Sequence, residues 1–239
     1  MINGKKVLAI IPARSGSKGL IGKNKKILCG KPLINWTIET ALTNNTIDMV
    51  LVSTDDQELA EISRLAGAFV PFIRPNHLAT DTATSVDVLS HAINFVRTDL
   101  GKIFHYVILL EPTSPIRDNS DIDSAFLQLV QNKNAKSIVG ISRTESQHPS
   151  FLVNLSKSNF IEIFEKGSVM PKRRQEVSSL YFLEGSLYIS EIDSLLSTLT
   201  FYHKYTLGYV IPKERAFEID DEIDFIIVEA LMKRRLGIS

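Results

Sequence analysis

Three glycines and four cations lie close together near the start of the sequence, in the stretch ARSGSKGLIGKNK at residues 13–25. The cations are Arg14, Lys18, Lys23 and Lys25, with Ser17 and Asn24 among them. Glycine lets a backbone approach a ligand closely and the cations supply positive charge, so we expect a polyphosphate to bind here. The spacing matches neither the P-loop nor the dinucleotide-binding fingerprint. A basic surface loop without a ligand is the alternative.

A group of carboxylates lies near the end of the sequence, in AFEIDDEID at residues 216–224. If residues 217–220 are extended, Glu218 and Asp220 point to the same face of the chain. Mg²⁺ is commonly bound by one or two carboxylates together with phosphate oxygens, so the pattern predicts a magnesium site. The alternative is that Asp220 or Asp221 caps a C-terminal helix. Both interpretations hold if Asp221 is the cap and Asp220 is the ligand.

Three further polar stretches follow apolar runs or lie between them. They are VSTDD at 52–56, RPNHLATDTATS at 74–85 and LLEPTSPIR at 109–117. In the second stretch Arg74, Asp81, Ala83 and Ser85 lie just ahead of a helix-like segment, and small or hydroxylated residues suit hydrogen bonds to a flat base. Each stretch alone is typical of an ordinary turn. Together they predict one binding site.

Alternating strand-like and helix-like segments must position these loops. Short apolar runs typical of buried strands lie at residues 7–11, 49–54, 106–110 and 137–141, and helix-like segments lie at 32–42, 55–67, 86–96 and 122–130. This alternation predicts an α/β fold with three α/β/α layers and a mostly parallel, Rossmann-like central sheet. Ligands of such sheets bind beyond the carboxyl ends of the strands, where the loops described above begin.

The alternation breaks between about residue 142 and residue 205, where short strands and turns are predicted instead. It returns with a strand-like run near 206 and a closing helix at 221–235. We therefore expect residues 1–141 and 206–239 to form a nucleotide-binding core and residues 142–205 to project from it. Apolar positions in the projecting segment would lack cover in a single chain, so we expect this segment to form a dimer.

Composition narrows the function further. The 239 residues include 27 Lys and Arg and 27 Asp and Glu, so no overall charge favours nucleic acid or an anionic membrane. The single cysteine, Cys29, allows no internal disulfide, and no apolar run approaches the length of a membrane span. The histidines show no metal-binding spacing, and the GxSxG motif of acyl-transfer enzymes is absent. We expect a cytoplasmic enzyme without zinc.

Several motifs occur in an order that resembles the CMP-sialic acid synthetases and their relatives that activate legionaminic and pseudaminic acids. These motifs are IIPARSGSKGLIGKN, VSTD, RPxxLATDTA, PTSPIR, RRQ, GSLYIS and FEIDD, and they span most of the chain. The resemblance implies a nucleotide-diphospho-sugar transferase fold and a Mg²⁺-dependent homodimer. It also implies transfer of CMP from CTP to a nonulosonic acid, a 2-keto sugar acid, with release of pyrophosphate.

The resemblance implies a role for particular residues. The triphosphate would be bound by Arg14, Ser17, Lys18, Lys23 and Asn24, and cytosine and ribose would lie near Arg74, Ala83 and Ser85. The sugar would contact Glu111, Arg174, Gln175, Tyr188, Phe201 and Tyr202, the last two in the partner subunit. The metal would be held by Glu218 and Asp220. Of these residues, Arg14, Lys18, Lys23 and Asp220 are the expected catalytic groups.

Two departures from the family pattern concern the sugar. Glu111 stands where the family usually has glutamine before PTSP, and FLEGS at 182–186 replaces the usual RPNGA. Both N-acetylneuraminate and a legionaminate-type sugar therefore stay open as substrates. The alternatives for the whole protein are a cytidylyltransferase for the sugar acid Kdo, a catalytically silent nucleotide-binding regulator and, more remotely, a nucleic-acid binder.

Overall fold

A six-stranded sheet forms the centre of the computed structural model, which describes residues 4–16, 19–144, 148–164 and 177–238. Its strands are β1 (Val7–Pro12), β4 (Met49–Ser53), β5 (Tyr106–Leu109), β6 (Ser137–Arg143), β9 (Tyr181–Glu191) and β10 (Thr206–Val210). They lie in the order β10-β6-β9-β5-β1-β4. Only β9 runs antiparallel to its neighbours, β5 and β6. The predicted mostly parallel sheet is confirmed.

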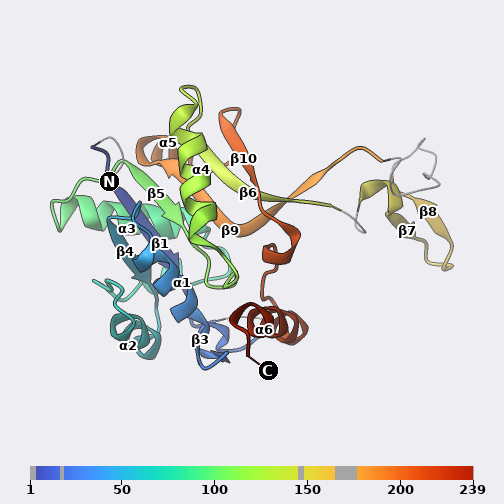
Figure 1. Cartoon of the computed structure of the whole chain (residues 1–239), viewed down its shortest axis with the longest axis horizontal. Coiled ribbons are helices and arrows are strands. Elements are labelled where there is room, and N and C mark those ends of the chain that lie inside the picture. The colour runs from blue at the N-terminus through green and yellow to red at the C-terminus, as the bar shows by residue number, and fades with distance from the viewer. Residues whose placement is uncertain (1–3, 17–18, 145–147, 165–176, 239) are drawn as a thin grey trace.

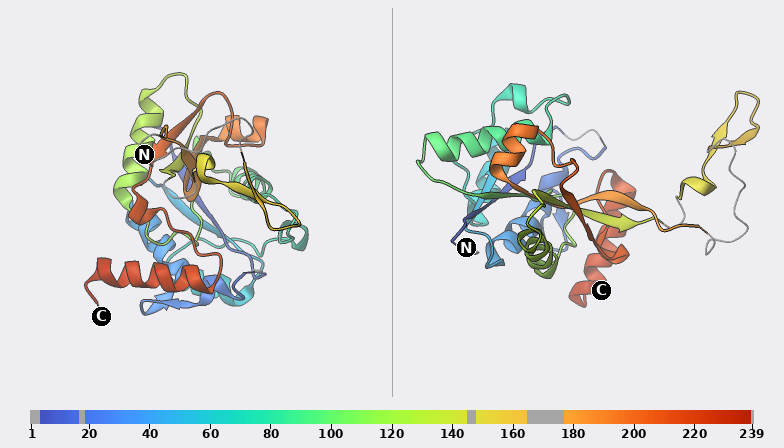
Figure 2. Two further views of the ribbon diagram at one scale, coloured as in Figure 1. Left: turned by 90° about the vertical axis from the view of Figure 1, so that its right-hand side faces the viewer. Right: turned by 90° about the horizontal axis from the view of Figure 1, so that it is seen from above.

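Helices cover both faces of this sheet (Figures 1 and 2). They are α1 (Leu33–Thr43), α2 (Gln57–Leu65), α3 (Ser85–Thr98), α4 (Asn119–Gln131) and α5 (Ile192–Thr198), whereas α6 (Glu222–Leu236) packs in a separate cluster beside the sheet. The alternation of side chains along β1 explains the layers. Val7 and Ile11 belong to a buried cluster with residues of α1, α2 and α4, whereas Leu8 and Ile10 belong to a second cluster with residues of α3 and α5. The three-layer α/β/α prediction is confirmed.

Shorter elements complete the chain. A small ribbon is formed by β2 (Ile27–Leu28) and β3 (Lys31–Pro32), and single 3₁₀ turns lie at Lys23–Lys25, Asn76–Leu78, Pro149–Phe151 and Lys213–Arg215. A hairpin of β7 (Val153–Leu155) and β8 (Ile161–Ile163) lies apart from the sheet (Figure 1). Among the described residues, none of the helices combines the length and the apolar character that a membrane span requires.

The predicted boundary of the projecting segment needs correction. Residues 142–205 were expected to project, but β9 lies inside this range and is inserted between β5 and β6 in the central sheet. Leu187 and Ile189 of β9 are fully buried in the core. The sequence pattern predicts a short strand at GSLYIS within this range but does not place it in the central sheet, because the strand returns antiparallel after a long excursion, outside the regular strand and helix alternation. Only the part around the β7–β8 hairpin projects (Figure 2).

The start of α6 is fixed by a capping box. The Asp221 carboxylate accepts hydrogen bonds from the backbone N–H groups of Ile223 (2.8 Å) and Asp224 (3.0 Å). The Asp224 carboxylate in turn accepts from the N–H groups of Asp220 (3.0 Å) and Asp221 (3.1 Å). Phe225, Val228 and Met232 on the inner face of α6 pack on Leu20, Leu28 and Leu33. The cap therefore fixes the residue at which the acidic stretch ends and α6 begins.

Asp221→Ala should lower the free energy of unfolding by about 1 kcal/mol, because two N–H groups of the first helical turn lose their acceptor. For a domain of this size, the expected fall in the melting temperature is about 2–4 °C. Thermal denaturation followed by circular dichroism measures it. Glu222→Ala is the matched control, since it removes only an exposed ion pair with Lys26 (3.0 Å). Equal effects of the two variants would contradict the role of the cap.

Candidate active site

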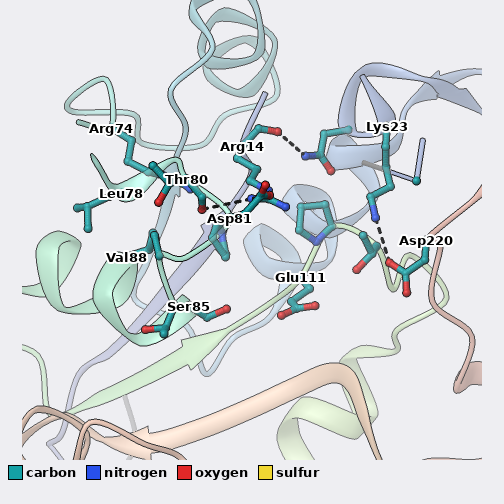
Figure 3. A pocket seen from close by; sticks show the side chains of 17 residues that line it. Arg14, Lys23, Arg74, Leu78, Thr80, Asp81, Ser85, Val88, Glu111 and Asp220 are labelled. Carbon is teal, nitrogen blue, oxygen red and sulfur yellow. Dashed lines mark hydrogen bonds and ion pairs between the residues drawn. The ribbon is translucent and has the colours of Figure 1, made fainter. Parts of the chain in front are cut away.

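A cavity of about 540 Å³ opens at the carboxyl ends of β1 and β5. Figure 3 shows Arg14 on one side of it and Ser85 and Glu111 on the other. Eight of the predicted site residues line this cavity: Arg14, Lys23, Asn24, Arg74, Ala83, Ser85, Glu111 and Asp220. Segments from both ends of the sequence therefore meet in one place. The predictions for Ser17, Lys18, Arg174 and Gln175 lie outside the described residues.

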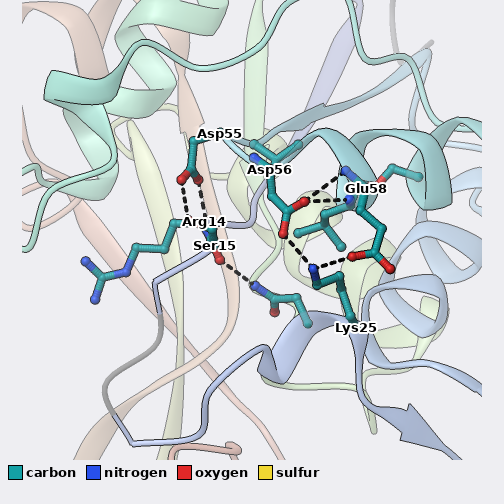
Figure 4. Close-up of polar contacts among 10 residues, drawn as sticks. Arg14, Ser15, Lys25, Asp55, Asp56 and Glu58 are labelled. Atoms are coloured by element: carbon teal, nitrogen blue, oxygen red, sulfur yellow. Dashed lines mark hydrogen bonds and ion pairs between the residues drawn. The ribbon is translucent and has the colours of Figure 1, made fainter.

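The loop after β1 is held in place by its own polar contacts (Figure 4). Asp55 accepts hydrogen bonds from the backbone N–H (2.9 Å) and the hydroxyl (2.5 Å) of Ser15. Lys25 forms ion pairs with Asp56 (2.9 Å) and Glu58 (2.6 Å), and these hydrogen bonds raise its pKa. Lys25 was expected to supply charge to a phosphate, but its ammonium group instead fixes the loop to α2.

Glycine is needed in this loop for close contact with the acidic segment. A Cβ added at Gly19 would lie 2.2 Å from the backbone oxygen of Asp220, which no side chain could accommodate. Gly22 has a φ of 64°, in the left-handed region that favours glycine. The two segments therefore pack backbone to backbone. The glycines were expected to let the backbone approach a ligand closely. The structure shows that Gly19 also lets the backbone of residue 220 pack against the loop.

Two cations line the part of the cavity where phosphates are expected, and both form hydrogen bonds with acceptors of the protein itself. Arg14 donates to Asp81 (2.9 Å) and to the carbonyl of Thr80 (3.3 Å). Lys23 donates to the carbonyl of Ile219 (2.6 Å) and lies 3.3 Å from the Asp220 carboxylate. The Arg14–Asp81 pair is partly exposed and can exchange partners with an incoming anion. Asp81 belongs to the predicted stretch at 74–85 but was not expected to pair with Arg14, and Thr80 was not singled out within that stretch.

The opposite end of the cavity is built from a buried arginine and the start of α3. Arg74 is only 3% exposed and donates to the hydroxyl of Ser53 (3.1 Å) and to the Ser53 carbonyl. Burial lowers its pKa to about 10, so it stays protonated at neutral pH. Ser85 begins α3 behind a capping box of Thr84 and Asp87. These contacts give the wall a fixed shape.

The two predicted metal ligands lie next to each other but differ in exposure. The Asp220 side chain is 81% exposed and faces the cavity, whereas Glu218 is half-buried, does not line the cavity and accepts a hydrogen bond from the N–H of Gly185. Burial raises the pKa of Glu218, and the nearby Asp220 charge raises it further. Among the described residues no three acidic, histidine or cysteine side chains converge. The pair suits a cation that also takes phosphate oxygens.

The segment of these carboxylates is held from two sides. The N–H of Ile219 donates to the carbonyl of Thr113 (2.9 Å), while the carbonyl of Ile219 accepts from Lys23 (2.6 Å). The Ile219 side chain is fully buried against α6. Asp221 caps α6 while Asp220 faces the cavity, so the two interpretations of the acidic stretch are compatible.

The predicted sugar residues meet on β9 and beside it. Tyr188 packs against Phe201 and Tyr202, with ring centroids 5.4 and 6.5 Å apart. Burial raises the pKa of Tyr188, and the Glu111 charge adds to this shift. Phe201 is only 4% exposed within its own core, so the prediction that it reaches a sugar in a partner subunit is wrong for this structure. Tyr202 is 48% exposed and is the member of the pair that a second molecule can contact.

This geometry defines an α/β nucleotide-binding protein with cations at one end of the cavity and a carboxylate pair beside them. Comparison with known proteins refines this class. A sequence model of the cytidylyltransferase family matches residues 8–220. The chain therefore belongs to the cytidylyltransferase family.

Named relatives and a solved structure agree with the family. The chain is 35% identical over 231 residues to the N-acylneuraminate cytidylyltransferase of Escherichia coli O18:K1:H7, which covers 96% of the chain but 53% of that protein. It is 34% identical over 233 residues to the CMP-N,N'-diacetyllegionaminic acid synthase of Legionella pneumophila, covering 95% and 97% of the two chains. A structure of CMP:2-keto-3-deoxy-manno-octonic acid synthetase with CTP has the same fold, with a TM-score of 0.69 at 19% identity over 96% and 99% of the chains.

Glu111 is expected to make the free energy of unfolding of the protein depend on pH. Burial, together with the nearby Glu218 charge, raises the pKa of Glu111 from 4.5 to about 7. Between these values the folded state binds a proton that the unfolded chain does not, so the free energy of unfolding falls as the pH rises through this window. Glu111→Gln should remove this fall and gain roughly 2 kcal/mol relative to the unaltered protein between pH 4.5 and pH 7.

Urea denaturation across this pH range without added divalent cations measures the difference. Glu162→Gln, at an exposed position of the β7–β8 hairpin, is the control and should follow the unaltered protein. Parallel stability curves for Glu111→Gln and the unaltered protein would contradict the raised pKa of Glu111, because they would show that folding does not change its protonation.

Proposed function

We propose that this protein transfers CMP from CTP to the C2 hydroxyl of a nonulosonic acid and releases pyrophosphate, with Mg²⁺ as its metal. The observation that carries the proposal is the convergence of Arg14, Lys23 and Asp220 with Arg74 and Ser85 around one cavity. Its family and the activities named for its relatives support the same reaction. The chain spans about half the length of the Escherichia coli relative, and nearly all of the Legionella one.

The triphosphate lies along the loop after β1 in this proposal. Arg14 exchanges Asp81 for phosphate oxygens, and the backbone near Gly16, which has open space around its Cα, approaches the phosphates. Cytosine and ribose lie toward Arg74, Ala83 and Ser85 at the start of α3. The fixed contacts of Arg74 with Ser53 make this wall rigid, and rigidity lowers the cost of ordering the nucleotide.

Asp220, with Glu218 behind it, would hold Mg²⁺ in the bound state. Mg²⁺ would neutralise phosphate charge and lower the pKa of the attacking hydroxyl. Lys23 now lies 3.3 Å from Asp220, so it compensates the carboxylate in the free protein and is adjacent to the leaving group in the complex. Both partners are thus placed before substrates bind, as catalysis by charge stabilisation requires.

The proposed reaction needs no covalent enzyme intermediate. The C2 oxygen of the sugar forms a bond to the α-phosphorus, the bond from that phosphorus to the bridging oxygen of pyrophosphate breaks, and the hydroxyl proton passes to solvent. Positioning and charge stabilisation then provide the catalysis. The proposed sugar is N-acetylneuraminate or a legionaminate-type acid. Glu111 lines the cavity on the side proposed for it, and Tyr188 is buried close enough to Glu111 to feel its charge.

Asp220→Asn should reduce kcat by about 10²-fold or more while the fold is retained, because the metal loses its exposed ligand. Pyrophosphate release is measured with CTP, Mg²⁺ and a panel of N-acetylneuraminate, N,N'-diacetyllegionaminate, pseudaminate and Kdo. Glu222→Gln, at a neighbouring exposed acid, should keep its activity. Turnover of Asp220→Asn at the rate of the unaltered protein would contradict the metal assignment. CTP consumption that is independent of any sugar would contradict the proposed reaction.

A homodimer is part of the same proposal. The β7–β8 hairpin carries large exposed apolar side chains, among them Leu155 (67%), Phe160 (73%), Ile161 (68%) and Phe164 (53%). A patch of this kind is typical of a protein interface. A second copy of the chain would cover it and bring Tyr202 close to the other subunit's sugar. The proposed reaction is cytoplasmic, where CTP is available.

The double substitution Phe160→Asp with Ile161→Asp should convert the dimer into a monomer, because it places two charges on the apolar hairpin. Sedimentation velocity measures the change in mass. Ser158→Asp on the same hairpin is the control and should leave a dimer. A monomer for the unaltered protein at micromolar concentration would contradict this part of the proposal.

A further inference from the structure

Arg117 lies beneath the active-site cavity and does not line it. Its side chain is 3% exposed, and it follows the PTSP turn after β5. Burial lowers its pKa to about 10, so the guanidinium is charged at neutral pH. An arginine that is charged, buried and out of reach of the substrates must act through other protein groups.

The guanidinium joins three separate elements. It donates to the carbonyl of Glu111 (2.9 Å), to the hydroxyl of Thr37 on α1 (3.3 Å) and to the carbonyl of Ser186 on β9. Arginine suits this task because its donors lie in a rigid planar fork. One side chain therefore sets the spacing between the cavity loop, β9 and α1.

These contacts lead directly to the carboxylates at the metal end. The loop from Glu111 to Arg117 contains Thr113, whose carbonyl accepts from the N–H of Ile219, between Glu218 and Asp220. On the other side, Ser186 follows Gly185, whose N–H donates to Glu218. Both backbone supports of the carboxylate segment are thus anchored within a few residues of an Arg117 hydrogen bond.

A purely electrostatic role for Arg117 is the main alternative. Glu184 is buried nearby and is the strongest of the acidic influences on Arg117. However, Glu184 accepts from the N–H (3.1 Å) and hydroxyl (2.6 Å) of Ser186. Within the described part of the chain Arg117 forms no ion pair, and two of its three acceptors are backbone carbonyls. These directional contacts fit a positioning role better than simple charge compensation.

We propose that Arg117 is a positioning residue for cytidylyl transfer, which holds Thr113 and Gly185 so that Glu218 and Asp220 face the metal. The inference rests on the proposed reaction and metal site. It assigns to the arginine of PTSPIR an effect on the two carboxylates proposed to hold the metal. The proposed contacts to the nucleotide come instead from Arg14, Arg74 and Ser85.

Arg117→Lys tests the proposal because it keeps the positive charge and loses the fork. We expect kcat to fall by about 10²-fold, as for a small misplacement of catalytic groups, with the KM for CTP within about threefold of the unaltered value. A second measurement does not depend on the sugar. The concentration of Mn²⁺ that half-saturates the enzyme with CTP, measured by electron paramagnetic resonance, should rise by about tenfold.

A second variant separates positioning from stability. Arg117→Met with Glu184→Gln removes both buried charges, so its melting temperature should exceed that of Arg117→Met alone. Its kcat should stay as low as that of Arg117→Lys. Lys136→Met with Glu191→Gln removes another ion pair that involves β9 (2.8 Å), distant from the cavity, and should leave kcat unchanged.

Two results would overturn the proposal. One is a kcat of Arg117→Lys, or of the double variant, within about twofold of the unaltered protein, which no positioning role could explain. The other is unchanged Mn²⁺ affinity in these folded variants. If the unaltered protein turned over none of the sugars, the proposed reaction would fail, and the Mn²⁺ measurement would still decide the role of Arg117.

Discussion

The structure depends most on how Ile219 is held. Its N–H is bound to the carbonyl of Thr113 and its carbonyl to Lys23, while its side chain is buried against α6. These contacts join the loop after β1, the loop after β5 and the start of α6 around one residue. They fix the exposed Asp220 beside the glycine-rich loop, and without them the cations and carboxylates would not share a cavity.

Two charged pairs of the cavity are already formed before any substrate is present. Arg14 is paired with Asp81 and Lys23 with Asp220, so each of these two cations has a carboxylate partner in the free protein. In the proposed complex, phosphate oxygens would replace Asp81 beside Arg14, and a metal ion would replace Lys23 beside Asp220. Such an exchange needs little movement of the protein, because the backbone on both sides is fixed by Asp55, Asp221 and Thr113.

The sequence predicts the parallel strands and their helices well, because each is a local pattern of apolar residues. For the acidic stretch the sequence leaves two interpretations open, and the structure shows that Asp221 is the helix cap while Asp220 lines the cavity. The sequence predicts a short strand at GSLYIS but not the insertion of β9 into the central sheet, because that insertion is set by long-range antiparallel pairing with β5 and β6. The pairing of Lys25 with α2 and the burial of Phe201 are likewise tertiary contacts that no local pattern encodes. The signal for Arg117 in the sequence is weak: it is the one charged residue of PTSPIR, a motif that is otherwise apolar or typical of turns.

The location of the nucleotide is the central claim, and a crystal structure of the protein with CTP and Mn²⁺ tests it most directly. The account predicts triphosphate density along the loop at 13–25, cytosine near Ser85 and an anomalous Mn²⁺ peak between Asp220 and the phosphates. Nucleotide bound elsewhere, or a metal peak remote from Asp220 and Glu218, would contradict it.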